Sequence, residues 1–534
     1  MELHLGGGDA LGRGDQMARP AGGSADILDV VIVGGGTAGW MAAASFAHFL
    51  KAAGTRVTLV ESSEIGTVGI GEATIPPIMD FIRVLGLDED ELIKHCNATF
   101  KLGIRFQDWG GIGRSFHHPF GQTGYPLEGV DFSAWWLSRY IDGRAARLED
   151  YSLMAVASEA GRFSRPIRGH NSPLSQITYA LHFDAALFAD FLKRYALERG
   201  VHRIDARIAG AELDPQNGFI KGVRLQDGRF VEGDLFIDCS GFRGLLIEET
   251  LGAGYEDWRC WLPCDRALAV QTTRTGPPAP YTLSIARSAG WQWRIPLQNR
   301  TGNGYVYCSD HVSDDAAADE LMSSLDGEPI TSPRALRFVA GRRRKFWSGN
   351  CVALGLAQGF LEPLESTSIH LVQRGLALLL KLWPDRHFDQ AEQDQYNSML
   401  AFEYERIRDF LVLHYQPTQR DDSSFWRHVR SIEPPESLQR RIELFRSHGR
   451  IVREENELFP VQSWLYIFMG LGIMPRNRDP LVQTLDPAQI DGHLESLRSL
   501  VKDCVQAMPS HEAFIAAHCA ASGGAPAAQL ERQT

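Results

Sequence analysis

The stretch DILDVVIVGGGTAGWMAAASFAHFL, residues 26–50, decides the fold class. Its apolar run Val30–Val33 predicts a buried strand, and the alanine-rich half after the glycines predicts a helix packed closely on a sheet. Gly34, Gly36 and Gly39 fit the pattern G-x-G-x-x-G. Glycines at this spacing permit a tight turn and let a pyrophosphate approach the N-terminus of the helix. The stretch therefore predicts a dinucleotide-binding α/β unit.

The segments that follow favour one kind of dinucleotide. TRVTLVES, residues 55–62, predicts a second strand that ends at Glu61, where an acid can bind a ribose hydroxyl. Two later runs, GDLFIDCSGFRG at 233–244 and NCVALGLAQG at 350–359, indicate that the chain returns to this first domain, as in FAD-dependent hydroxylase-type folds. No second glycine fingerprint follows a strand downstream. We therefore expect FAD without a resident NAD(P)H site, so that reduced flavin arrives from elsewhere.

Composition excludes several classes of protein. The 534 residues predict more than one domain or subdomain, and the net charge of -12 argues against a nucleic-acid partner. No apolar stretch reaches the roughly 18 residues of a membrane span. The densest basic run, GRRRKFW at 341–347, reads as a solvated strand end. The eight cysteines are scattered without a zinc pattern, so no metal is expected and a reduced, cytoplasmic protein is the default.

Three further motifs identify a family. GWQWRIP at 290–296 has the pattern W-x-W-x-I-P of flavin-dependent halogenases, NATFKLGIRFQDW at 97–109 resembles the segment with their catalytic lysine, and EPLEST at 362–367 resembles their flavin and halide loop. The segments GGGTAGWMAA, GIGEATIP and DLFIDCSGFRGLLI extend the match. The chain thus resembles the tryptophan-halogenase family from about residue 28 to about residue 480.

The resemblance implies that reduced FAD, dioxygen and chloride or bromide yield hypohalous acid, which passes through the protein to an electron-rich aromatic ring. Lys101 would hydrogen-bond or capture this oxidant, because its apolar neighbours desolvate the ammonium group. Glu365 would stabilise the developing ring cation and accept the ring proton. Thr367 and Ser368 would present backbone N–H groups to the halide. Glu362 is the weaker candidate and reads as a structural acid.

The resemblance also assigns the other contacts. His118 and Phe120, in SFHHPFG, would lie against the aromatic substrate, and Trp291 and Trp293 would line the passage beside the flavin. The residues that would line or pack near the FAD are Gly34, Gly35, Gly36, Thr37, Ala38, Gly39, Glu61, Ser62, Ile65, Val68, Ile70, Ala73, Ile208, Leu356 and Ile369.

Two departures bear on the substrate. Family members that act on free tryptophan have a tyrosine-rich lid followed by a tryptophan, whereas the equivalent run at 453–475 is shorter, lacks paired tyrosines and has Phe459 where the tryptophan falls. The halide loop has Ser368 in place of a glycine. We therefore expect a more open site, typical of the indole-accepting branch, which favours indole over the tryptophan zwitterion.

The expected architecture is a mixed α/β fold in four parts. A disordered leader over 1–27 precedes a FAD-binding core over 28–385, whose substrate-side layer comes from 110–184 and 255–340 and carries an antiparallel sheet. A helical region over 386–520 would close the site, before a disordered tail over 521–534. Asp184 is expected to cap the helix that follows it.

Partners and rival functions complete the prediction. The partners implied are a small, indole-like aromatic substrate and a separate NAD(P)H:flavin reductase, while the oligomeric state stays open between monomer and homodimer. One alternative is a single-component flavin-dependent aromatic monooxygenase, which would need its own nicotinamide site and a Gly-Asp pair where Leu356 stands. The other is a non-catalytic flavoprotein that binds an aromatic ligand, which gives no reason to keep Lys101 together with Glu365.

Overall fold

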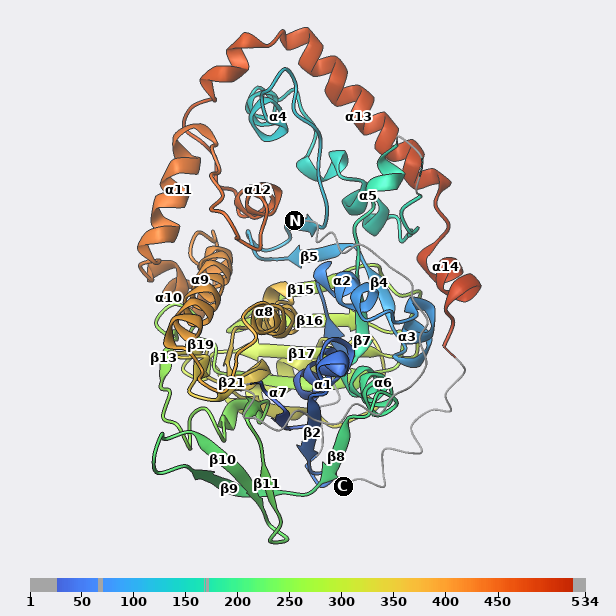
Figure 1. The fold of residues 1–534 in the computed structure, drawn as a ribbon. Coiled ribbons are helices and arrows are strands. Elements are labelled where there is room, and N and C mark those ends of the chain that lie inside the picture. Colours follow the sequence, from blue (N-terminus) through green and yellow to red (C-terminus); the bar gives the residue numbers. More distant parts are fainter. Residues whose placement is uncertain (1–25, 66–70, 168, 170–171, 522–534) are drawn as a thin grey trace.

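The computed structural model of the protein describes residues 26–65, 71–167, 169 and 172–521 (Figure 1). Apart from residues 26, 27 and 521, the predicted leader and tail lie outside the described residues. So do two of the predicted FAD contacts, Val68 and Ile70.

A six-stranded sheet carries the dinucleotide motif. Its strands, in spatial order, are β20 (Trp347–Ser348), β21 (Cys351–Ala353), β12 (Leu235–Asp238), β1 (Asp29–Val33), β2 (Arg56–Glu61) and β8 (His202–Asp205). All neighbours pair in parallel except β20 and β21. In register, Val31 of β1 faces Phe236 on one side and Thr58 on the other. The strands predicted from 30–33, 233–244 and 350–359 thus meet in one sheet.

The turn between β1 and helix α1 (Thr37–Phe49) requires its glycines. Gly34 has φ of 109°, and a Cβ there would lie 2.3 Å from the carbonyl oxygen of Cys239. This turn brings α1 back over the sheet, where it packs against α6 (Ala185–Leu197). The Asp184 carboxylate accepts hydrogen bonds from the first free backbone N–H groups of α6, which confirms the predicted cap.

A second, seven-stranded sheet lies beside the first. Its strands, in spatial order, are β18 (Arg334–Arg337), β14 (Arg266–Thr272), β17 (Thr301–Tyr307), β16 (Gly290–Pro296), β15 (Thr282–Arg287), β5 (Gly103–Gln107) and β6 (Ser115–Pro119). Every pair is antiparallel except β15 with β5. The antiparallel sheet expected from 255–340 is therefore present, whereas 110–184 contributes only β6 to it.

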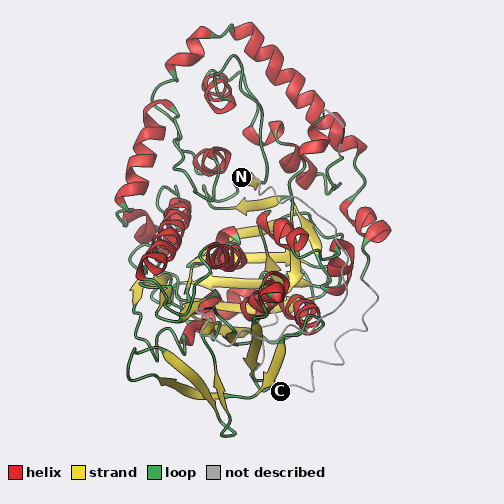
Figure 2. Ribbon diagram, in the orientation of Figure 1, coloured by secondary structure: helices red, strands yellow, loops and turns green. Residues whose placement is uncertain are grey.

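Three small sheets and the helices complete the fold (Figure 2). The sheets are β3 (Gly71–Ala73), β7 (Ala180–Asp184) and β4 (Thr99–Lys101); β9 (Ile208–Leu213), β10 (Ile220–Leu225) and β11 (Phe230–Glu232); and β13 (Tyr255–Asp257), β19 (Gly341–Arg343) and β22 (Gly359–Phe360). The remaining helices are α2 (Pro77–Val84), α3 (Glu89–His95), α4 (Phe132–Ile141), α5 (Leu153–Glu159), α7 (Asp314–Ser323), α8 (Ser368–Lys381), α9 (Gln390–Tyr415), α10 (Ser424–Ser431), α11 (Glu436–His448), α12 (Val461–Gly470), α13 (Pro487–Ala507) and α14 (His511–His518).

The C-terminal helices enclose one end of the molecule. Figure 1 shows α11, α13 and α14 arching over α4, α5 and α12, so that the region after residue 386 is mostly helical, as its periodicity predicts. Helix α12 packs on β6 and on α9, which connects this arch to the second sheet. None of the described helices has both the length and the apolar character needed to cross a membrane.

One local expectation is wrong. The basic run at 341–347 is not a solvated strand end, because Arg342 and Arg343 are buried in β19. Arg343 donates to Glu248, and the Arg342 guanidinium lies over the rings of Trp258 and Phe346. Ion pairs and aromatic faces replace the water that these cations lose on burial.

Candidate active site

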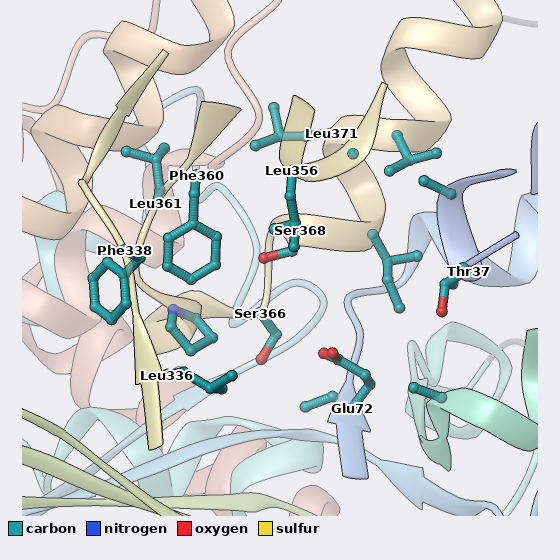
Figure 3. A pocket seen from close by; sticks show the side chains of 18 of the residues that line it. Thr37, Glu72, Leu336, Phe338, Leu356, Phe360, Leu361, Ser366, Ser368 and Leu371 are labelled. Carbon is teal, nitrogen blue, oxygen red and sulfur yellow. The ribbon is translucent and has the colours of Figure 1, made fainter. Parts of the chain in front are cut away.

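A cavity of about 330 Å³ opens beside the β1–α1 turn, where the first sheet meets the second (Figure 3). Gly36, Thr37 and Ala38 form one wall, and Trp291 and Trp293 of β16 form another. The segment from Leu356 to Val372 supplies much of the rest, including Leu356, Ser366, Ser368 and Ile369. The carboxyl end of a parallel sheet at a glycine turn is the usual place for a nucleotide.

The walls of this cavity fit FAD. No side chain caps the N-terminus of α1, so its first backbone N–H groups are available to a pyrophosphate, and the first turn has no acidic residue to repel one. Gly36 faces open space, since a Cβ built there meets no atom within 4 Å. The aliphatic and aromatic lining of the deeper part suits a flat ring system. Glu61 is the last residue of β2, and its side chain lies next to Gly35. It accepts a hydrogen bond from Arg203 at 2.6 Å.

The predicted FAD contacts fall into three groups. Those that line the cavity are Gly36, Thr37, Ala38, Ala73, Leu356 and Ile369. Those that build or follow the turn without lining the cavity are Gly34, Gly35, Gly39, Glu61, Ser62 and Ile65. Ile208 stands apart, because it lies on β9 in a separate small sheet and packs against a second apolar cluster. Ile208 does not line the cavity, and its contact with FAD stays a prediction.

Glu72 is a cavity residue that sequence reasoning missed. Figure 3 shows its carboxyl group pointing into the cavity, across from Thr37. Burial raises the pKa of Glu72 to about 7. The only signal for it was its place in the GIGEATIP motif. Among the described residues, no three side chains form a group that could hold a metal ion.

Lys101 is the last residue of β4 and is completely buried, with 0% exposure. Its Nζ atom donates to the carbonyl oxygen of Thr74 and to Oγ of Ser366, each at 2.9 Å. The ring centroid of Phe120 lies 5.3 Å from the same atom. Burial lowers the pKa of Lys101 to about 7, although the charge of Glu365 opposes this shift. Both protonation states are therefore accessible near neutral pH.

Ser366 connects Lys101 to the cavity. Its side chain lines the cavity and also accepts the hydrogen bond from Lys101. Ser366 has φ of 59°, an unusual conformation for a residue with a side chain, and this backbone turn separates Glu365 from the start of α8. Sequence reasoning did not single out Ser366, because the partner is 265 residues away and leaves no local signal.

Glu365 lies on the Lys101 side of this turn and is 1% exposed. His118 Nδ1 is 2.9 Å from its Oε2 atom, and His414 Nε2 is 2.9 Å from its Oε1 atom. Burial raises the pKa of Glu365, but the attraction of His118 and hydrogen bonds from His118 and His414 outweigh it and hold the pKa at about 2. Glu365 is thus a carboxylate in a site without water access. His414 is a further residue that the motifs did not reveal.

Glu362 is in a different environment. It accepts hydrogen bonds from Trp291 Nε1 at 2.9 Å and from the Tyr415 hydroxyl, and its Oε1 atom has no partner among the described residues. Burial raises the pKa of Glu362 to about 7, against the effect of these two donors. The turn therefore holds two buried carboxyl groups with opposite pKa shifts, and Glu362 supports the indole ring of Trp291 in the cavity wall.

The start of α8 follows directly. Thr367 is its N-cap residue, but no side chain caps the helix, and the first turn has no acidic residue. The Thr367 hydroxyl is buried and has no hydrogen-bond partner within the described part of the chain. Ser368 lines the cavity. Free N–H groups beside an unpartnered hydroxyl form a setting that suits a small anion.

The predicted substrate side is lined by aromatic rings and is closed. Phe459 stacks on Phe410 with ring centroids 3.9 Å apart, and both rings lie near His118. Just before Phe459, Glu457 is buried in a two-point ion pair with Arg441. That the site is more open than in enzymes acting on free tryptophan stays a prediction. A short segment without paired tyrosines still covers the site, because its aromatic ring and one buried ion pair anchor it.

Comparisons with known proteins agree with one another. The sequence model of the family described as tryptophan halogenase matches residues 29–487. The tryptophan 6-halogenase SttH of Streptomyces toxytricini is 36% identical over 91% of this chain and 98% of its own length. Among solved structures, the flavin-dependent halogenase BrvH from Brevundimonas sp. BAL3 is 49% identical, with a TM-score of 0.89 over 92% of this chain and 99% of BrvH. Xcc4156, a flavin-dependent halogenase from Xanthomonas campestris, is 45% identical, with a TM-score of 0.90 over 93% and 100% of the two chains.

Proposed function

Because the chain belongs to the tryptophan halogenase family, we propose that its Lys101–Glu365 site halogenates an electron-rich aromatic ring of the indole type. The chain is a flavin-dependent halogenase, since it is similar along nearly its whole length to halogenases of known sequence and structure. The same similarity favours halogenation over the alternative of a single-component monooxygenase. What remains to be proposed is the role of each residue, the substrate and the source of reduced flavin.

The cavity beside the β1–α1 turn would hold the FAD. Gly36, Thr37 and Ala38 at the start of α1 suit its pyrophosphate, and the wall with Trp291 and Trp293 suits its ring system. When bound in reduced form, FAD supplies the activation of dioxygen with which a halide becomes hypohalous acid. The two tryptophans fill the sheet side of the cavity, so an organic substrate has no room beside the flavin.

The halide would bind at the start of α8. This helix end has free N–H groups, Thr367 beside it has a buried hydroxyl without a partner among the described residues, and Ser368 lies in the cavity wall. The positive end of the helix dipole favours an anion there.

A single observation carries the role of Lys101. Ser366 lines the cavity and binds Lys101 Nζ at 2.9 Å, so a small oxidant formed in the cavity reaches the lysine by passing one hydroxyl group. The ammonium form of Lys101 donates a hydrogen bond to hypohalous acid. The neutral amine instead takes the halogen: an N–halogen bond forms, and the amine proton leaves with hydroxide as water. A pKa of about 7 makes both forms available.

Glu365 would act on the ring. Its charge faces the position where a positive charge develops when the halogen adds to a ring carbon, and this attraction is strong because the site excludes water. The ring C–H bond then breaks, its electron pair restores aromaticity, and the proton moves to a carboxylate oxygen. His118, Phe120 and Phe459 supply aromatic faces for the substrate, with Phe459 leaving its stack on Phe410 to admit a ring.

An indole-like substrate suits the charge balance of this site better than an amino acid. Glu457 and Arg441 neutralise each other, and Glu365 is already bound by two histidines, so these groups offer nothing to a zwitterion. The experiment that tests the proposal is mass spectrometry of products from indole, tryptophan and a panel of phenols. A flavin reductase, NADH, FAD and either chloride or bromide are supplied, and halogenated indole is the expected main product. Absence of halogenated product from every substrate would contradict the proposal.

A further inference from the structure

The histidine behind Glu365 has a fixed pattern of hydrogen bonds. His414 lies in α9 and is completely buried, with 0% exposure. Its Nδ1 atom is 2.8 Å from the carbonyl oxygen of Phe410, one turn earlier in the same helix. A carbonyl oxygen only accepts hydrogen bonds, so Nδ1 carries a proton. The tautomer is therefore set by the backbone of α9.

The other ring nitrogen must share a proton with Glu365. His414 Nε2 is 2.9 Å from Oε1 of Glu365, which is too close for two lone pairs without a proton between them. The proton belongs either to the carboxyl group, which leaves His414 neutral, or to Nε2, which makes His414 an imidazolium.

The surroundings of Glu365 decide between these two states. His118 Nδ1 also lies at hydrogen-bond distance from this carboxyl group, and the Lys101 side chain is the other cationic group that faces it. Two nitrogen partners and a nearby cation favour the ionised carboxylate. Around His414 itself, the rings of Phe106 and Trp109 lie 5.0 Å and 6.1 Å away and carry no charge. Glu365 is therefore the group that pairs with a charge on His414.

We propose that His414 is a positioning residue that carries protons on both ring nitrogens and holds Glu365 as an oriented carboxylate. The inference deepens the proposed function and rests on the role proposed there for Glu365. His414 binds Oε1 and His118 binds Oε2, each at 2.9 Å, so the two histidines together fix the orientation of the carboxylate. His414 also balances the negative charge of Glu365, so that Lys101 does not have to stay protonated to do so.

The direct test is the protonation state of His414, read by ¹⁵N NMR of histidine side chains in the full-length protein. The wild type is expected to show an imidazolium signal, from a ring protonated on both nitrogens, that belongs to His414. The signal should be missing from His414→Gln and should become a neutral Nδ1–H ring in Glu365→Gln. A neutral ring at position 414 in the wild type at pH 7.5 would overturn the proposal. Because this measurement requires no turnover, it is independent of whether the protein halogenates indole.

Kinetics provide the second arm. His414→Phe keeps the size of the ring but removes both the donor and the charge, and we expect kcat for indole halogenation to fall at least about tenfold with little change in KM. His414→Gln keeps a neutral donor toward Oε1 and should recover part of the loss. His428→Gln, on the exposed face of α10, is the matched control. Equal kcat values for wild type, His414→Gln and His414→Phe would contradict a positioning role.

Discussion

At the scale of single residues, the proposed chemistry requires a lysine that ionises near neutral pH. Burial lowers the pKa of Lys101 to about 7, so the neutral amine that takes up a halogen becomes populated as the pH rises through this value. We predict that single-turnover halogenation, started with pre-reduced FAD, speeds up between pH 6 and pH 8. The midpoint should be the same with chloride and bromide if it belongs to the protein. A midpoint that differs between the halides would assign the titration to the hypohalous acids instead.

The same lysine should reduce stability. Between the folded pKa of about 7 and the ordinary lysine pKa of 10.5, the unfolded chain binds more protons than the folded chain, so the stability of the wild type rises with pH in this window. Lys101→Met removes the buried ionisable group. We predict a higher Tm than the wild type at pH 6.5, with a difference that shrinks toward pH 10. Thermal unfolding of both proteins across this range is the measurement, and a constant difference in Tm would contradict it.

At the scale of elements, we propose that the turn between β22 and α8 carries the chemistry and that the segment before α12 selects the substrate. The turn motif predicted Glu365, Thr367 and Ser368 at the site because these residues are adjacent in sequence. It did not predict Ser366 or His414 as partners, because their contacts form only when β4 and α9 pack against the turn. The contact of Ile208 with FAD stays a prediction, since Ile208 lies on β9, just after strand β8, which pairs with β2 beside Glu61.

The side chains of the segment before α12 are the basis for predicting the preferred substrate. The buried carboxylate of Glu457 in this segment is paired with Arg441. The segment also places the apolar ring of Phe459 where a zwitterion would need polar partners. We predict a higher kcat/KM for indole than for tryptophan, with halogenation mainly at C3, the most nucleophilic ring carbon, because no group aims a less reactive carbon at Lys101. Steady-state kinetics and NMR of the products measure this. A preference for tryptophan at C5, C6 or C7 would contradict it.

At the scale of the whole molecule, the sequence predicted the dinucleotide-binding unit and the cavity walls. It did not predict contacts between segments that are distant in sequence. Glycine spacing fixed the β1–α1 unit, and the family motifs located the cavity walls at Trp291, Ala73 and Leu356. The parallel pairing of β5 with β15 and the burial of Arg342 and Arg343 were not predictable, because both depend on neighbours that are distant in sequence. The stacking of Phe459 on Phe410 likewise depends on packing between α9 and a segment distant in sequence.

The organisation of the chain also predicts its source of electrons. The sequence has a single glycine fingerprint that follows a strand, so we propose that a separate NAD(P)H:flavin reductase supplies the reduced flavin. We predict no halogenated product from the purified protein with NADH, FAD, oxygen and halide alone, and recovery when a reductase is added. Turnover by protein shown to be free of reductase would contradict this prediction.

The central claim is that the halogen travels inside the protein from the flavin cavity to Lys101 and then to the substrate. The most direct measurement compares bromination of indole by wild type, Lys101→Ala and the exposed-surface control Lys221→Ala, with a reductase and with excess methionine to consume hypobromous acid in solution. FAD binding is measured in parallel by fluorescence. We predict brominated indole from wild type and Lys221→Ala, and a loss of at least about a hundredfold in Lys101→Ala with FAD binding unchanged. Bromination by Lys101→Ala at the rate of the wild type, or suppression of the wild-type product by methionine, would contradict the account.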